Sequence, residues 1–225
     1  MLVHHRLIAT IVVVFASGSL LVLCPCSDAA ARIIHVPGDE PTVEAGISAS
    51  TFGDTVLVAS GTYYEHDLAP KPGTTIAGAT GSPESVVIAA EQKARIFCCE
   101  SPGDTVTIRG FTLTGGAATE ELYEDSSGGA VMCRDSSIRL QSCLIQGNSA
   151  ASSGGGLDCS NAHAVIRDVS FIGNAAYVGG GLGIYGGSSV LENVTFDSNS
   201  ATSAGAMHGY QSSSTMQGVV FSLNS

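Results

Sequence analysis

The segment 191–199 reads Leu-Glu-Asn-Val-Thr-Phe-Asp-Ser-Asn, and its pattern, Leu-x-x-Val-x-Phe-x-x-Asn, decides the fold. Related copies of the pattern begin at Leu140, Ile166 and Met216. The copies end at Asn148, Asn174, Asn199 and Asn224. These asparagines are 26, 25 and 25 residues apart. A fixed period of roughly 20–50 residues is typical of stacked repeats that bury their apolar faces against one another, so the sequence predicts a solenoid.

A second periodic element, rich in small residues, precedes each copy of the pattern. It occupies residues 128–131, 154–157, 179–182 and 204–207. Apolar residues two positions apart put their side chains on one face of a short strand. Each unit then holds about three short strands, separated by Gly, Ser and Asn turns.

The repeated asparagines are predicted to form a structural ladder. Asn tolerates the left-handed backbone region, so we expect each one at a recurrent bend. Its side-chain amide can bond to the same group in the coils above and below. A surface row of ligand-binding amides is the functional alternative.

Two kinds of solenoid fit this period. The spacing also matches the leucine-rich-repeat pattern, but that fold completes each unit with a segment that is usually helical. Paired glycines such as Gly179-Gly180 strongly disfavour helix. They suit the tight turns between the strands of a parallel β-helix, which is the fold we expect.

The repeat elements also resemble those of a known group of proteins. Gly128-Gly129-Ala130-Val131 and the Phe-x-x-Asn copies look like the repeats of chlamydial polymorphic outer-membrane proteins and related bacterial β-helix repeat proteins. Residues 53–65 resemble the opening coil of bacterial proteins in the broad pectin-lyase-like superfamily. With the general preference for right-handed crossovers, the resemblance implies an all-β, right-handed parallel β-helix of six or seven coils. It also implies a bacterial surface or secreted protein, since family members are surface-exposed and some are adhesins.

The chain is expected to contain a signal peptide and one domain. Residues 1–31 combine a weakly basic start, an apolar run at 7–23 and a small-residue cleavage site, which together predict a secretory signal peptide. The alternative is a retained membrane anchor, because a run of about 17 residues can marginally span a bilayer. Cleavage would leave residues 32–225 as a secreted or cell-surface β-helix that does not itself insert into the membrane.

The two ends of the solenoid are predicted to differ. Residues 41–47 read as a short helix, with Val43 and Ile47 on one face, that covers the first coil as a cap. The last repeat reaches Asn224 with no capping segment after it. We therefore expect the natural protein to continue beyond this chain, because an uncapped coil exposes its apolar ladder and strand edge.

An acidic insertion is the candidate binding site. The repeat lengthens to 32 residues between Gly116 and Asn148, and the excess contains Glu120, Glu121, Glu124 and Asp125. Insertions in solenoids form loops on one face, which is often the binding face. Four carboxylates can bind a hard cation such as calcium, the only cofactor that the sequence suggests. The alternative is an acidic, solvated loop that merely tolerates extra length.

No catalytic constellation stands out. Asp158, Asp168, Glu192 and Asp197 occur singly, and Met207-His208-Gly209 resembles a catalytic segment of polygalacturonases without the accompanying Asp motifs. The net charge of −11 argues against nucleic acid and anionic membranes as partners. The sequence therefore predicts an exported scaffold for binding or adhesion to a polysaccharide or a host or cell-surface protein. The alternative is a polysaccharide lyase or glycoside hydrolase, because fold analogy alone does not decide.

The cysteines leave their pairing open. Cys133 and Cys159 fall at equivalent positions in adjacent units, so either a disulfide or stacked core thiols fits. Cys143 replaces Val in the repeat pattern and is expected in the core as a small apolar residue.

Overall fold

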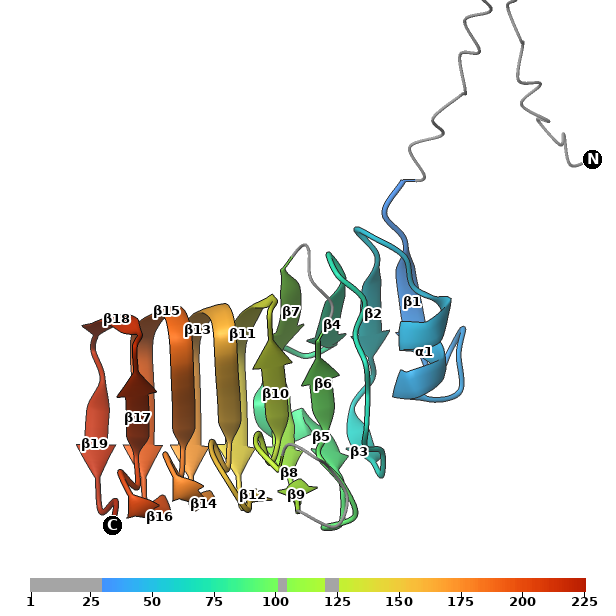
Figure 1. The fold of residues 1–225 in the computed structure, drawn as a ribbon. Coiled ribbons are helices and arrows are strands. Elements are labelled where there is room, and N and C mark those ends of the chain that lie inside the picture. The colour runs from blue at the N-terminus through green and yellow to red at the C-terminus, as the bar shows by residue number, and fades with distance from the viewer. Residues whose placement is uncertain (1–29, 101–104, 120–125) are drawn as a thin grey trace, which may run out of the picture. The chain divides into compact units, whose positions relative to one another are not determined.

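The computed structural model describes residues 30–100, 105–119 and 126–225. Residues 31–225 form one unit, a parallel β-solenoid of about seven coils stacked along one axis (Figure 1). The predicted all-β parallel β-helix is confirmed. The predicted signal peptide at 1–31 lies outside the described residues except for its last two positions. Within the described ranges, no helix is long and apolar enough to cross a membrane.

The N-terminal coils are built from short elements. They are β1 (Ile33–Val36), α1 (Val43–Ala49), β2 (Thr55–Val58), β3 (Gly61–Tyr63), β4 (Thr75–Gly78), the 3-10 helix η1 (Pro83–Ser85), β5 (Val86–Ala89), β6 (Phe97–Cys99), β7 (Val106–Arg109), β8 (Thr112–Thr114) and β9 (Ala117–Ala118).

The C-terminal coils contain longer strands that continue around a corner. The elements are β10 (Val131–Arg134), β11 (Ser137–Gln146), β12 (Ser149–Ala150), β13 (Leu157–Ile172), β14 (Ala175–Val178), β15 (Leu182–Asp197), β16 (Ser200–Ser203), β17 (Met207–Tyr210), β18 (Ser213–Gln217) and β19 (Val220–Ser222).

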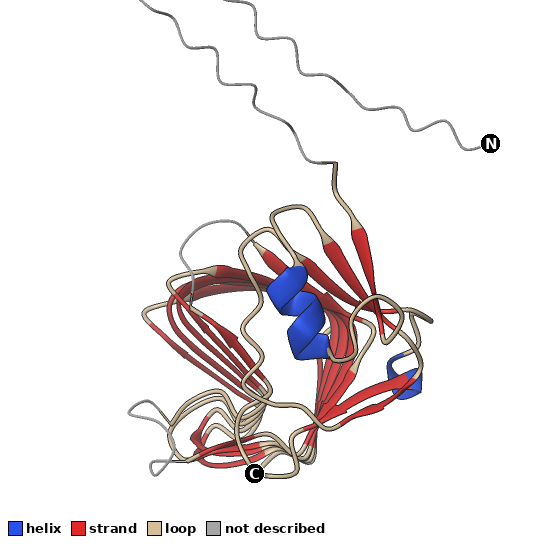
Figure 2. Ribbon diagram, turned by 90° about the vertical axis from the view of Figure 1, so that its right-hand side faces the viewer, coloured by secondary structure: helices blue, strands red, loops and turns tan. Residues whose placement is uncertain are grey.

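Parallel, in-register pairing joins each coil to the next. Strand β13 pairs with β15 from Leu157 opposite Leu182 to Ile172 opposite Asp197, a constant offset of 25 residues. Most strands belong to one 15-stranded sheet that wraps around the solenoid. The face of it that consists of β6, β10, the first parts of β13 and β15, and β17 is here called the third sheet. A separate four-stranded sheet contains β9, β12, β14 and β16. Seen end-on, the strands surround a single interior (Figure 2).

The interior is filled by ladders of like residues. Phe171 and Phe196 are fully buried, and their rings stack with centroids 4.9 Å apart. Phe221 continues this stack at 5.3 Å from Phe196. Offset stacking of aromatic rings adds about 0.5–1.5 kcal/mol per pair to the burial of apolar area. The 25-residue period thus creates a continuous core that no single coil could form.

Helix α1 caps the first coil, as the sequence predicts. Val43 and Ile47 are buried on the side that faces the solenoid, and Figure 2 shows α1 lying across its end. The Thr42 side chain accepts a hydrogen bond from the N–H of Ala45 at 3.1 Å. The Glu65 carboxylate accepts bonds from the N–H groups of Val43 and Glu44, both at 2.8 Å. The neighbouring coil therefore supplies part of the helix cap.

The repeated asparagines are joined by hydrogen bonds from coil to coil. Asn174 Oδ1 accepts from the backbone N–H and the side-chain Nδ2 of Asn148, at 3.1 and 2.9 Å. The same pair of bonds joins Asn174 to Asn199 and Asn199 to Asn224. Gly116 N–H donates to Asn148 Oδ1 at 2.8 Å, so the ladder extends one coil further. Asn148, Asn174 and Asn199 are buried, which excludes the alternative of a surface row of ligand-binding amides.

The expected left-handed conformation of these asparagines is wrong. The residue before each of them turns the chain instead, at Gly147, Gly173, Ser198 and Leu223, with φ between 51° and 62°. The left-handed residue places the following side chain toward the interior, where the Asn amide reaches backbone groups of its own and neighbouring coils. In each coil, the residue before the Asn therefore forms the bend, and the Asn itself forms the ladder.

The glycine-rich element lies tightly against the aromatic ladder. A Cβ on Gly156 would lie 2.8 Å from the Phe171 ring and 2.6 Å from the carbonyl oxygen of Gly181. Gly181 is equally crowded by Phe196. Glycine is needed here because two backbones and a ring meet without room for a side chain.

We predict that Asn174→Ala will lower the free energy of unfolding by about 3 kcal/mol, because it removes bonds to Asn148, Asn199 and Ile145 and leaves buried backbone groups unpaired. Urea denaturation followed by circular dichroism measures this. Asn161→Gly is the control, since Asn161 is exposed, its amide bonds to Asp135, and its φ of 51° suits glycine. A loss as small as that of the control, about 0.5 kcal/mol, would contradict a stabilising role for the ladder.

Candidate functional site

The acidic residues predicted to bind calcium, Glu120, Glu121, Glu124 and Asp125, lie outside the described residues. The chain is described again from Ser126 and Ser127, which are buried. Within the described ranges, no group of three or more His, Cys, Asp or Glu side chains is placed to hold a metal ion. Calcium binding by the insertion stays a prediction.

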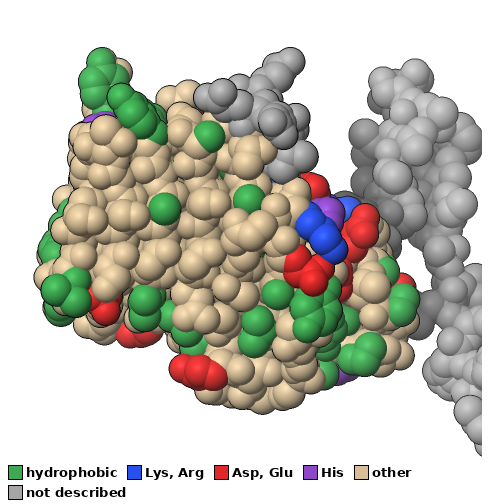
Figure 3. Space-filling view, turned by 90° about the horizontal axis from the view of Figure 1, so that it is seen from below, with side chains coloured by type: hydrophobic (Ala, Val, Ile, Leu, Met, Phe, Trp, Pro, Cys, Tyr) green, Lys and Arg blue, Asp and Glu red, His purple; other side chains and the backbone are tan. Residues whose placement is uncertain are grey.

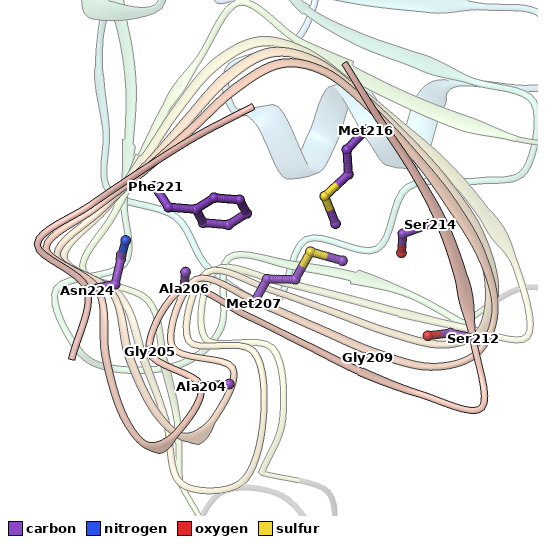
Figure 4. A pocket seen from close by; sticks show the side chains of 10 residues that line it. All are labelled: Ala204, Gly205, Ala206, Met207, Gly209, Ser212, Ser214, Met216, Phe221 and Asn224. Atoms are coloured by element: carbon purple, nitrogen blue, oxygen red, sulfur yellow. The ribbon is translucent and has the colours of Figure 1, made fainter. Parts of the chain in front are cut away.

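A cavity of about 610 Å³ lies at the last coil. Figure 4 shows Met207, Met216 and Phe221 pointing into it. Met207 and Met216 are the register partners of Leu182 and Leu191, which are fully buried one coil earlier. This cavity is therefore the core seen in cross-section, and its lining reflects stacking rather than a site built for a small ligand.

A row of outward-facing side chains on the third sheet is the better candidate. Successive register partners in it are Cys98, Met132, Asp158, Gly183 and His208. Side chains alternate along a strand, and the neighbouring row of Cys99, Cys133, Cys159 and Ile184 is buried in the core. We call the outward-facing set the third-sheet row.

Asp158 is the most unusual member of the row, because it is only 1% exposed. Its Oδ1 accepts a hydrogen bond from Ser160 Oγ at 3.1 Å. Its Oδ2 and Ser153 Oγ are both buried without a hydrogen bond in the described part of the chain. A Cβ on Gly183 would overlap Ser153 Oγ and lie 2.8 Å from Asp158 Oδ2. The segment that links β12 to β13 therefore folds over Gly183, beside the carboxyl group.

The surroundings of Asp158 favour its neutral form. Burial raises the pKa of the carboxyl group above its ordinary value. The hydrogen bond from Ser160, the neighbouring Ser153 hydroxyl group and the positive charges of Arg134 and Arg95 act in the opposite direction but do not outweigh burial. Arg95 is itself buried, and its Nη1 lies 2.7 Å from Met132 Sδ.

Aromatic side chains gather at the C-terminal end of the third sheet. The Tyr185 ring lies 5.5 Å from the His208 ring and 6.5 Å from the Tyr210 ring, between centroids. Tyr185 is partly exposed, and Tyr210 is 57% exposed. Tyr185 and Tyr210 are register partners in β15 and β17, so stacking places them side by side. We call Tyr185, His208 and Tyr210 the aromatic cluster.

Charged groups are distributed unevenly over the molecule. Seen from below, they gather toward the N-terminal coils, whereas the C-terminal coils present mostly neutral side chains and backbone (Figure 3). The N-terminal coils carry exposed polar contacts such as His66 with Asp67 and the ion pair of Lys93 with Glu91. In the later parts of β13 and β15, Arg167 binds Glu192 through two bonds of 2.6 and 3.2 Å.

The structure brings together some residues that appeared isolated in the sequence. Asp158 and His208 share the third-sheet row, separated by Gly183, whereas Asp168 accepts a bond from Asn193 at an exposed corner elsewhere. The sequence contained a signal for this grouping, because Asp158, Gly183 and His208 follow one another at intervals of 25 residues, as do Tyr185 and Tyr210. Applying the repeat period to the outward-facing positions would have revealed the row and the aromatic cluster.

Comparison of the chain with protein-family models, curated proteins and solved structures finds no match. What the structure supports of the predicted family resemblance is the parallel β-solenoid architecture. The candidate site is defined by its own geometry.

We predict that Asp158→Asn will change the pH dependence of stability. Because the folded pKa of Asp158 is raised, its contribution is fully present below the unfolded pKa of about 3.9 and is lost as pH rises through the folded value. Wild type should therefore lose stability relative to the neutral Asn variant as pH rises above the unfolded pKa, as measured by urea denaturation. Asp168→Asn, at an exposed corner, controls for the loss of one negative charge. Parallel curves for wild type and Asp158→Asn would contradict the prediction.

Proposed function

We propose that this chain is an exported, cell-surface or secreted β-helix scaffold that binds a polysaccharide through its aromatic cluster. The observation that supports this most directly is the grouping of Tyr185, His208 and Tyr210 at one end of the third sheet. Their positions are fixed by strand pairing with the rigid core, so the rings are held in place before a ligand arrives.

The chemistry of the cluster suits sugars. The C–H faces of sugar rings pack against aromatic rings, and the Tyr hydroxyl groups remain available for hydrogen bonds. Ser160, the register partner of Tyr185, adds a hydroxyl group beside the rings. An apolar platform flanked by a few fixed polar groups is the usual composition of a small-molecule or sugar site.

Binding is favoured over cleavage on this face. A raised carboxyl pKa is a property of general acids in glycoside hydrolysis, and Asp158 has it. Yet the Asp158 side chain is 1% exposed beneath the segment that carries Ser153, so a glycosidic oxygen has no direct approach to it. We therefore rank a carbohydrate-active enzyme second.

We predict that the double variant Tyr185→Ala, Tyr210→Ala will bind polysaccharide at least roughly tenfold more weakly than wild type, because it removes two stacking surfaces. A glycan array identifies the ligand, and titration calorimetry with that ligand measures the loss. Tyr64→Ala is the matched control, since Tyr64 is 67% exposed on an N-terminal coil.

Equal weakening by the Tyr64 control, or unchanged binding by the double variant, would contradict the proposal. Absence of any glycan binding by wild type would favour a protein partner for the same scaffold. Repeating the array with a calcium chelator separates the aromatic cluster from the acidic insertion. Only binding that depends on Glu120, Glu121, Glu124 and Asp125 through calcium should be lost.

A further inference from the structure

Three cysteines form a column inside the solenoid. Cys99, Cys133 and Cys159 are successive register partners in β6, β10 and β13. Their exposed fractions are 1%, 0% and 0%, and all three are free thiols. The column lies on the inner side of the third sheet, directly behind the third-sheet row.

The middle cysteine, Cys133, lies one strand away from each of its two neighbours. Neighbouring strands in a sheet are about 4.8 Å apart, which is within the Cα separation of about 4.4–6.8 Å that disulfides span. Cys99 and Cys159 are two strands apart, at roughly twice this distance, which is beyond disulfide reach. Cys133 can therefore pair with either neighbour, whereas the outer two cannot pair with each other.

We propose that the column is a disulfide site in which Cys133 forms one bond, with either Cys99 or Cys159, and leaves the third thiol free. The reaction consumes one low-molecular-weight disulfide such as glutathione disulfide. The Cys133 thiolate attacks it and releases one glutathione thiolate. A neighbouring cysteine thiolate then attacks Cys133 Sγ, forms the protein disulfide and releases the second glutathione.

The folded state limits when the disulfide can form. Burial raises the pKa of the Cys99 thiol, and hydrogen bonding to Cys133 together with burial raises that of Cys159. Thiolates are the reactive form, so the closed core reacts slowly, and the bond forms while the chain folds or when a coil opens. Once formed, it links adjacent coils covalently and limits separation of β10 from β6 or from β13. The inference is independent of the proposed sugar binding.

The test is oxidative refolding of the full chain with glutathione disulfide, followed by alkylation and mass-spectrometric sequencing of cross-linked peptides. Wild type should give Cys99–Cys133, Cys133–Cys159 or a mixture of both. Cys99→Ala should give only the second link, and Cys159→Ala only the first. Cys133→Ala should give neither. Oxidised wild type should also unfold at a higher temperature than the same sample after dithiothreitol.

Cys143→Ala is the matched control, because Cys143 is also buried but is paired with Val169 in a different part of the core. It should give the same link or links as wild type, which separates loss of the bond from loss of core volume. Circular dichroism establishes that each variant has refolded. Absence of both links in refolded wild type, or a Cys99–Cys159 link in refolded Cys133→Ala, would overturn the proposal.

Discussion

In-register parallel pairing between coils is the constraint on which the structure depends. It gives each inward-facing residue an environment set largely by the residues about 25 positions before and after it. Phe196 is stacked between Phe171 and Phe221, and Asn199 is bonded to both Asn174 and Asn224. A ladder is stable because each buried amide or ring meets its own kind at a distance that the strand spacing sets. The period of the sequence and the continuity of the core therefore have the same cause, which is the stacking of equivalent residues in register.

The same constraint leaves the outward-facing positions free to vary. The inward row is apolar throughout and consists of Phe97, Val131, Leu157, Leu182 and Met207. The third-sheet row beside it contains a thiol, a thioether, a carboxyl group, a glycine and an imidazole. Close packing in the shared core restricts the first row, whereas the second row faces away from that core and Asp158 in it is covered by a connecting segment. Chemically distinct residues at equivalent positions of a solenoid therefore indicate where the stacking requirement is absent, and such positions can carry function.

The sequence predicted what depends on period and composition. The parallel β-helix, the N-terminal helix with Val43 and Ile47 buried, and the inward position of Cys143 all follow from alternation and spacing. The predicted position of the left-handed residue at each bend was wrong by one, because that residue precedes the Asn. Local preference favours Asn in the left-handed region, whereas the ladder needs the Asn side chain inside. The burial of Asp158 was not predictable, because it depends on a connecting segment that brings Ser153 over Gly183. Irregular connections carry no period from which to infer such a contact.

The two regions of the solenoid respond to pH in opposite directions. Near the N-terminus, the Arg32 guanidinium and two backbone N–H groups bind the buried Asp54 carboxylate at 2.8–2.9 Å and lower its pKa. This contribution to stability is present above the unfolded pKa and is lost as pH falls. At the start of β13, adjacent Asp158 and Cys159 both have raised pKa values, one on each side of the strand, and their contributions are lost as pH rises. Since neighbouring repeats unfold as partly independent units, acid should loosen the first coil and alkali the coil that contains β13. The coil that contains Asp158 and Cys159 therefore loses stability as pH rises, whereas the first coil loses stability as pH falls.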